Sequence, residues 1–155
     1  MARKKRVPLK LVGVAELNAL FDRLGKLPLG SAPKAARRGA RVLADAIKAK
    51  APVDTGMLRR GIYTMPEKRS RKGKRVFQVT YRSDMNDWFV KHYGPKLEKR
   101  AYYPASMEYG YRTRGGGYIP GYYFMRKTAE QKKAEIEQVI ISVVAAEMDK
   151  MLSKR

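Results

Sequence analysis

The segment at residues 51–59, which reads APVDTGMLR, constrains the fold most, because helical periodicity precedes it and strand periodicity follows it. Pro52 ends the preceding helix, since the residue ahead of a proline resists the α conformation. Asp54 and Thr55 are residue types whose side chains can bond to nearby backbone groups in a turn, and Gly56 permits a positive φ. The segment is therefore predicted to be a corner that leads from a helix into a strand.

Two helices are predicted before this corner. Between residues 14 and 24, apolar side chains recur at steps of three and four, which is the spacing of one helical face. The run Leu-Pro-Leu-Gly at 27–30 predicts a break. Ser31 can cap a second helix that ends before Pro52. We therefore expect an N-terminal helical pair.

A long helix is predicted at the end of the chain, from about Thr128 to Leu152. Thr128 and Gln131 have the spacing of a capping box. The apolar surface of this helix is broader than one small sheet requires, so part of it is expected to contact another subunit. The alternative is that the helix only crosses its own sheet. The residues expected at the subunit interface are Ile140, Val144, Met148, Met151 and Leu152.

Strands are predicted between the helices. Residues 58–64 and 75–81 are short segments rich in β-branched and aromatic side chains, and they flank a basic stretch at 66–74. A long hairpin with a basic, flexible tip follows from this arrangement. Residues 84–121 are aromatic and glycine-rich, and 112–117 is predicted to be a loop. The expected fold class is α+β, with a small antiparallel sheet and a long basic hairpin packed against an N-terminal helical pair and a long C-terminal helix.

Net charge is the unusual property of the composition. Thirty-five Lys and Arg residues face 14 Asp and Glu residues, which gives +21. A surplus of this sign attracts nucleic acid, and it would equally attract an acidic protein surface. Residues 1–12 are expected to form a mobile basic arm ahead of a single domain at 13–155.

The sequence offers no set of residues typical of catalysis. There is no cysteine, and the only histidine, His92, has no neighbouring carboxylate and no second histidine with which to hold a metal. Asp84 and Asp87 lie in a predicted turn, which these residue types favour. We therefore expect a protein that is no enzyme and needs no cofactor or metal. A metal-dependent nuclease that uses Asp84 and Glu108 is the remaining catalytic alternative.

The corner at 51–59 is also the first of three stretches that resemble a known family, the tail-completion or head–tail joining proteins of long-tailed bacteriophages. This family has Asp-Thr-Gly-x-Leu-Arg after a helix-ending turn. Here the same pattern begins at Asp54 and includes Gly56 and Leu58.

The second and third stretches follow in the same order as in the family. Residues 102–110 are similar to its aromatic segment that ends in Glu-aromatic-Gly, although Tyr111 stands where Thr is usual. Residues 123–129 keep Phe124 and Ala129 of the third pattern, with a tyrosine in place of its proline. The three stretches together are much more specific than any one of them.

The resemblance implies a structural protein without catalytic residues. Such proteins are small α+β subunits that assemble as a ring, commonly sixfold, at the top of the tail tube. They meet the head connector on one side and the tail tube protein on the other. No apolar run approaches the roughly 20 residues of a membrane span, so no membrane partner is expected. The expected locations are the head–tail junction of the virion and, during assembly, the host cytoplasm.

In such a ring, basic residues of the arm and the hairpin would face packaged DNA that passes through the channel, because phosphates attract Lys and Arg without sequence preference. The same residues could instead dock on acidic surfaces of neighbouring proteins, and the sequence leaves both open. The predicted contact residues are Arg3, Lys4, Lys5, Arg6, Lys68, Arg69, Arg71, Lys72, Lys74 and Arg75.

The main alternative function is sequence-independent nucleic-acid binding, by a ribosomal-like or nucleoid-like protein. The net charge and the ten tyrosines favour it, since aromatic side chains among basic ones can stack on bases. However, the aromatic residues cluster at 102–123, whereas the densest charge lies at 1–10 and 68–75. A stacking platform would interleave the two.

Overall fold

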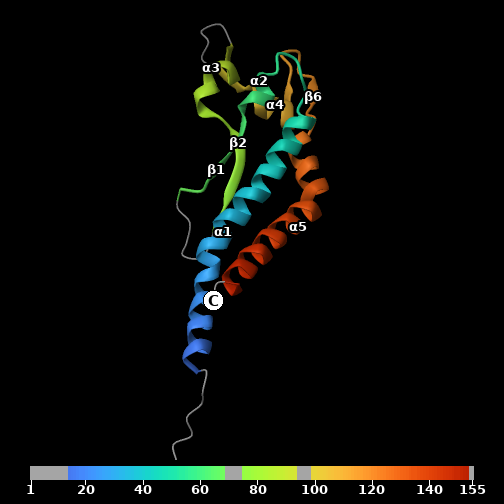
Figure 1. Cartoon of the computed structure of the whole chain (residues 1–155). Coiled ribbons are helices and arrows are strands. Elements are labelled where there is room, and N and C mark those ends of the chain that lie inside the picture. Colours follow the sequence, from blue (N-terminus) through green and yellow to red (C-terminus); the bar gives the residue numbers. More distant parts are fainter. Residues whose placement is uncertain (1–13, 69–74, 94–98, 154–155) are drawn as a thin grey trace, which may run out of the picture.

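Two long helices lie side by side along the molecule, and short helices and strands gather near one end of the pair (Figure 1). The computed structural model describes residues 14–68, 75–93 and 99–153. The predicted α+β class is confirmed. The elements are α1 (Val14–Lys50), α2 (Met57–Gly61), β1 (Ile62–Pro66), β2 (Phe77–Tyr81), a 3-10 turn (Ser83–Met85), α3 (Asn86–Phe89), β3 (Val90–Tyr93), β4 (Lys99–Tyr102), α4 (Tyr103–Tyr109), β5 (Gly110–Arg112), β6 (Tyr118–Pro120) and α5 (Phe124–Leu152).

Helix α1 is continuous, so the predicted break at 27–30 and the expected helical pair are wrong. The helix runs for 37 residues, or about 55 Å. A proline inside a helix costs about 3 kcal/mol, which is why the local sequence predicts an end there. Residues on both sides continue the backbone hydrogen bonding, and the later part of α1 packs against α5. Ser31 is buried within the helix instead of capping its start.

The corner after α1 is largely as predicted. The helix ends at Lys50, two residues before Pro52, and Gly56 has a φ of 77°. Asp54 and Thr55 are exposed, and no hydrogen bond joins their side chains to the described backbone of the turn.

The residues after the corner form the short helix α2, so the strand predicted from Leu58 begins instead at Ile62. A strand over this stretch would place Leu58, Arg60 and Ile62 on one face, because side chains alternate along a strand. The helical turn buries Leu58 and Ile62 while Arg59 and Arg60 stay exposed. Keeping Arg60 in water while Leu58 and Ile62 are both buried explains why the helix replaces the strand.

Within the described part of the chain, the strands form three separate two-stranded antiparallel ribbons, and not one small sheet. The predicted hairpin is confirmed as β1 paired with β2, with Ile62 opposite Tyr81 and Pro66 opposite Phe77. The aromatic region at 84–121 contains the other two ribbons, β3–β4 and β5–β6, together with the helices α3 and α4.

The core lies where the end of α1 meets the start of α5. Small side chains on α1 allow close approach, which Gly39 illustrates, because a Cβ there would lie 3.1 Å from Cγ1 of Ile140 on α5. The buried apolar residues of this core are Ala44, Ile47, Ala51, Leu58, Ile62 and Phe124.

An aromatic trio extends the core toward the short elements. The rings of Tyr81, Phe89 and Tyr102 meet edge to face, with centroids 5.7–6.4 Å apart. Gly61 lies against Phe89, and a Cβ at this glycine would be only 2.7 Å from Cε2 of that ring. Burial, followed by the charge of Glu108, raises the pKa of Tyr81 far above its ordinary value.

Candidate interaction surfaces

Glu108 joins the second of the three family-like stretches to the third. Its side chain is 4% exposed. One carboxylate oxygen accepts a hydrogen bond from the backbone N–H of Met125, and the other accepts one from that of Arg126, both at 3.0 Å. These N–H groups belong to the first turn of α5, which has no partner for them within the helix and favours negative charge. Glu108 therefore caps α5 from outside the helix.

This cap explains where α5 begins. The helix starts at Phe124, four residues before the predicted start at Thr128. Thr128 is buried inside the helix, so the predicted capping box with Gln131 is wrong. No local signal marks the true start of the helix, because the capping carboxylate lies 17 residues before Met125. Both oxygens of Glu108 face the helix end, which argues against a nuclease role for this residue.

Two glycines bring the segments on either side of the β5–β6 hairpin together. Gly110 has a φ of 86°, and a Cβ there would collide with the carbonyl oxygen of Ile119. At Gly121, a Cβ would collide with the carbonyl group of Glu108. The backbone N–H of Tyr123 also donates to that carbonyl oxygen at 3.0 Å. The Glu-aromatic-Gly pattern is therefore part of a closely packed junction, which we call the Glu108 junction.

Helix α5 differs in charge from the rest of the chain. Its five basic and five acidic residues give a net charge of zero, so the other parts of the chain carry the whole surplus of +21. One side of the helix packs on α1, as the contact between Gly39 and Ile140 indicates.

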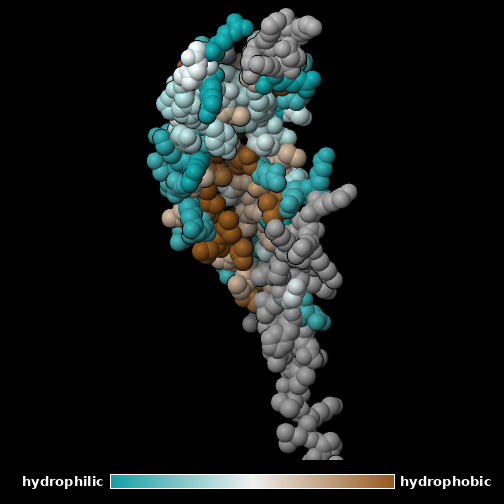
Figure 2. Space-filling model, turned by 180° about the vertical axis from the view of Figure 1, so that it is seen from behind, coloured by the Kyte–Doolittle hydropathy of each residue, from teal (hydrophilic) through white to brown (hydrophobic). Residues whose placement is uncertain are grey.

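A second side of α5 carries apolar residues at steps of three and four, which we call the α5 strip. Ile141 is 59% exposed, Leu152 is 49% exposed and Met148 is 36% exposed, while Val144 is half-buried. Seen from behind, the molecule has an apolar region about midway along its length, on the side that α5 occupies (Figure 2). Such an exposed stripe is typical of a surface that contacts another macromolecule.

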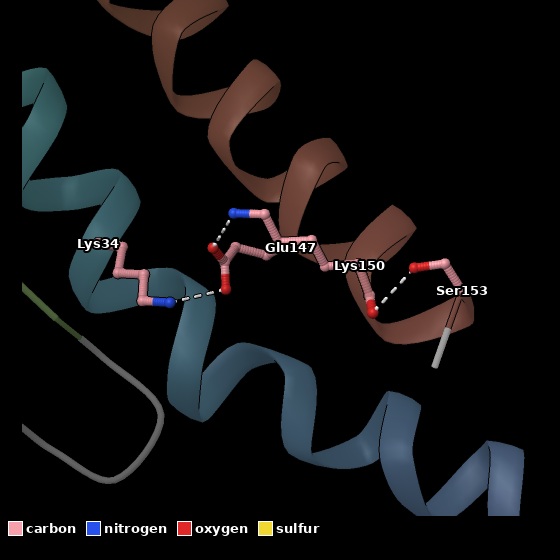
Figure 3. A network of polar contacts seen from close by, with 4 residues as sticks. All are labelled: Lys34, Glu147, Lys150 and Ser153. Carbon is pink, nitrogen blue, oxygen red and sulfur yellow. Dashed lines mark hydrogen bonds and ion pairs between the residues drawn. The ribbon is translucent and has the colours of Figure 1, made fainter. Parts of the chain in front are cut away.

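The α5 strip borders an ion pair that fastens α5 to α1. Nζ of Lys34 lies 2.8 Å from one carboxylate oxygen of Glu147, and Lys150 approaches the other (Figure 3). The hydrogen bond from Lys34 lowers the pKa of Glu147 below its ordinary value. Glu147 lies near the C-terminal end of α5, and α1 continues past that end of α5 (Figure 1).

The predicted subunit-interface residues fall on two sides of α5. Ile140 lies against α1 of the same chain, and Val144 and Met151 are half-buried. Met148 and Leu152 are exposed in the α5 strip. Ile141 was not among the predicted interface residues, although its spacing of seven from Met148 is the helical signal that indicates it.

Most of the predicted basic contact residues lie outside the residues that the structure describes. The residues at 3–6 and 69–74 lie outside the described part of the chain, while Lys68 and Arg75 are described and exposed. A third basic group, which was not among the predicted contact residues, lies on the exposed side of α1. It contains Arg37, Arg38 and Arg41, and the guanidinium of Arg37 lies over the ring of Phe77.

The described residues show no grouping suited to metal chemistry. No cluster of three or more His, Asp or Glu residues that could hold a metal occurs in residues 14–68, 75–93 and 99–153. Asp84 pairs with Arg82, whose hydrogen bond lowers the pKa of Asp84. His92 is exposed on β3. Nor does this part of the chain contain a helix long and apolar enough to cross a membrane.

An exposed apolar strip, a neutral helix in a basic chain and a closely packed capping junction are features typical of an assembly subunit. The family model described as "Bacteriophage HK97-gp10, putative tail-component" matches residues 15–93. The chain therefore belongs to this family and is a structural component of a phage tail. No curated protein and no solved structure matches the chain.

The matched range runs from α1 to β3 and contains the first of the three family-like stretches, the corner at 51–59. The second and third stretches lie beyond it, in the part of the chain that forms the Glu108 junction and α5.

Proposed function

We propose that this tail component is a tail-completion subunit, which assembles as a ring at the top of the tail tube and joins the tube to the head connector. Membership of the tail-component family supports a role in the tail. The observation that carries the more specific proposal is the α5 strip, an exposed apolar surface on a helix with no net charge.

Charge explains why α5 suits contact between identical subunits. Copies of a chain with a charge of +21 repel one another, and the repulsion is strongest where basic surfaces face each other. A neutral helix offers a place where two copies approach without adding to that repulsion. Burial of exposed apolar area contributes about 25 cal/mol per Å², so the four residues of the α5 strip can stabilise such a contact.

Within the ring, the basic residues outside α5 would face DNA in the channel or acidic surfaces of the neighbouring proteins. Lys68 and Arg75 flank the tip of the β1–β2 hairpin, and both are exposed. Arg37, Arg38 and Arg41 add an exposed group on α1. DNA contacts would be sequence-independent, since phosphate is the target.

The mass of the protein in solution, alone and with the tail tube protein of the same phage, tests the proposal. Light scattering after size-exclusion chromatography should give a closed multiple of the subunit in the presence of the tube protein. The double variant Ile141→Glu/Met148→Glu should lose this assembly, because its new charges would be buried at the subunit contact. Ser142→Glu/Ala146→Glu is the matched control, since it adds the same two charges at exposed positions on another side of α5.

Two outcomes would count against the proposal. Assembly of Ile141→Glu/Met148→Glu at the wild-type mass would remove the α5 strip from the interface. A wild-type protein that stays monomeric with the tube protein, and binds free DNA in a strongly salt-dependent way, would instead favour the nucleic-acid-binding alternative.

A further inference from the structure

The β5–β6 hairpin and its flanks form a second exposed surface, which we call the tyrosine hairpin (residues 109–123). It holds five of the ten tyrosines of the chain. Exposed aromatic area of this extent adds little to the stability of the subunit, and it is typical of an interaction site. The exposed apolar and aromatic side chains are Tyr109 (63%), Tyr111 (47%), Tyr118 (57%), Ile119 (43%) and Tyr122 (58%).

The backbone and one side chain hold this hairpin in place, although it has no core of its own. All three residues of β6 are exposed. A short two-stranded ribbon is marginally stable by itself. Here the hydroxyl of Tyr118 donates to the carbonyl oxygen of Tyr109 at 2.5 Å, and the N–H of Thr113 donates to the carbonyl oxygen of Gly117 at 2.8 Å. A surface ordered in this way loses less conformational entropy when it binds a partner.

The charged residues of the tyrosine hairpin are unlike those of the rest of the chain. Its only charges are Arg112 and Arg114, which are exposed and have no ion-pair partner among the described residues. The chain contains many lysines, yet none lies between Lys99 and Lys127. Tyrosine and arginine are enriched at the centres of protein–protein interfaces, where lysine is depleted. The composition therefore favours a protein partner.

We propose that the tyrosine hairpin docks on an acidic surface of a different protein of the tail. The two unpaired arginines require negative charge from the partner, and a second copy of this basic chain is poorly suited to supply it. DNA is disfavoured because this segment carries only two positive charges, whereas denser basic groups lie elsewhere in the chain. This inference rests on the chain being a tail component and does not require the ring.

The hairpin and the α5 strip can be occupied at the same time. The tyrosine hairpin ends where α5 begins, at Phe124, and the α5 strip starts 17 residues later at Ile141. A helix rises 1.5 Å per residue, so the two surfaces lie about 25 Å apart along α5. One subunit could therefore contact another copy and an unlike partner together.

The register of the ribbon places one apolar pair on the face opposite to Arg112. Tyr111 lies opposite Ile119, and Arg112 lies opposite Tyr118. Directly opposed residues share one face of an antiparallel ribbon. One face thus carries Tyr111 and Ile119, and the other carries Arg112 and Tyr118, so substitution of Tyr111 and Ile119 removes an apolar contact without removing an arginine.

Photocrosslinking in assembled tails tests the proposal with the full-length protein. The substitution Tyr111→p-benzoylphenylalanine places a crosslinker on the exposed aromatic face, and mass spectrometry identifies the peptide attached on irradiation. We expect a peptide of a different tail protein with an excess of Asp and Glu. The same crosslinker at Trp88, an exposed aromatic residue on α3, should not attach to that peptide.

Two variants then measure binding to the purified protein identified in this way. Tyr111→Ser/Ile119→Ser should weaken binding at least tenfold. Arg112→Gln/Arg114→Gln should weaken it less and should make binding less dependent on salt, because the ionic contribution of these two residues is lost. Trp88→Ser is the control and should bind as the wild type does.

Four results would overturn the proposal: a crosslink to a second copy, a crosslink to DNA, no crosslink at all, or hairpin variants that bind like the wild type. None of these depends on the mass of the free protein. A failure here is therefore distinguishable from a failure of the proposed ring.

Discussion

Glu108 and Tyr109 are neighbours in the chain, yet their environments are opposite. Glu108 is 4% exposed and both of its carboxylate oxygens hold backbone N–H groups of α5, whereas Tyr109 is 63% exposed. The Glu108 junction is filled by hydrogen bonds and by glycines that leave no room for a Cβ. The tyrosine hairpin beside it presents rings to solvent. One short segment thus combines a part that holds the fold together with a part that contributes little to it.

The difference between the Glu108 junction and the tyrosine hairpin indicates how folding and assembly can be tested separately in this protein. Substitutions in closely packed regions should lower the free energy of unfolding. Substitutions on the tyrosine hairpin should change binding and leave stability almost unaltered. A larger loss of stability from substitutions on the tyrosine hairpin than from those in the closely packed regions would contradict this distinction.

The largest effect on stability is expected for Glu108→Ala. The change removes two charge-assisted hydrogen bonds at the start of α5 and leaves two partly buried N–H donors without this acceptor, so the free energy of unfolding should fall by about 3 kcal/mol. Urea denaturation followed by circular dichroism measures it. Glu108→Gln keeps one acceptor and should lose about half as much. Equal stability of the alanine variant and the wild type would show that α5 needs no external cap.

A slightly smaller loss is expected for Gly61→Ala, in the other closely packed region. The new Cβ would overlap the ring of Phe89, which is buried and fixed by edge contacts with Tyr81 and Tyr102. Overpacking of this kind costs about 2 kcal/mol, although alanine alone would favour the helix. The double variant Gly61→Ala/Phe89→Leu should recover part of the loss in the same urea experiment. No recovery would place the cause outside the contact with Phe89.

These two residues show the limits of prediction from the sequence. The C-terminal end of α1 and the pairing of β1 with β2 follow from local signals, namely Pro52, Gly56 and alternating apolar side chains. The cap of α5 does not, because Glu108 is distant in sequence from the helix it caps. Likewise the continuity of α1 through 27–30 depends on the helix as a whole, which a local break signal does not represent.

The two proposed interaction surfaces, the α5 strip and the tyrosine hairpin, were also only partly predictable from the sequence. Helical spacing in α5 correctly indicated apolar area beyond the core, including Met148 and Leu152. It could not tell which side faces α1, because that depends on packing against Gly39. The tyrosine hairpin was visible only as an aromatic and glycine-rich stretch. Its exposure comes from the pairing of two three-residue strands, which are too short to give a recognisable alternation.

A small, pH-dependent effect is expected for Glu147→Gln, which removes the ion pair with Lys34 (Figure 3). The folded-state pKa of Glu147 lies below its ordinary value, so the pair contributes stability above the ordinary pKa and loses it as the pH falls through the folded-state pKa. The melting temperature of the variant should therefore lie slightly below that of the wild type at neutral pH. The two should converge in acid. A difference that persists at low pH would assign the effect to packing and not to charge.

The smallest effect on stability is expected for Tyr111→Ser, on the exposed tyrosine hairpin. Its side chain is 47% exposed, and substitutions at such surface positions change stability by about 0.5 kcal/mol or less. Tyr118→Phe is the informative neighbour, because it keeps the ring but removes the hydroxyl that donates to Tyr109. Urea denaturation of both variants, set beside that of Glu108→Ala, measures the contrast directly. If Tyr111→Ser lost as much stability as Glu108→Ala, the tyrosines would belong to the core and the hairpin would no longer be a docking surface. If only Tyr118→Phe lost stability, one tyrosine would hold the hairpin in place while the others remained available for a partner.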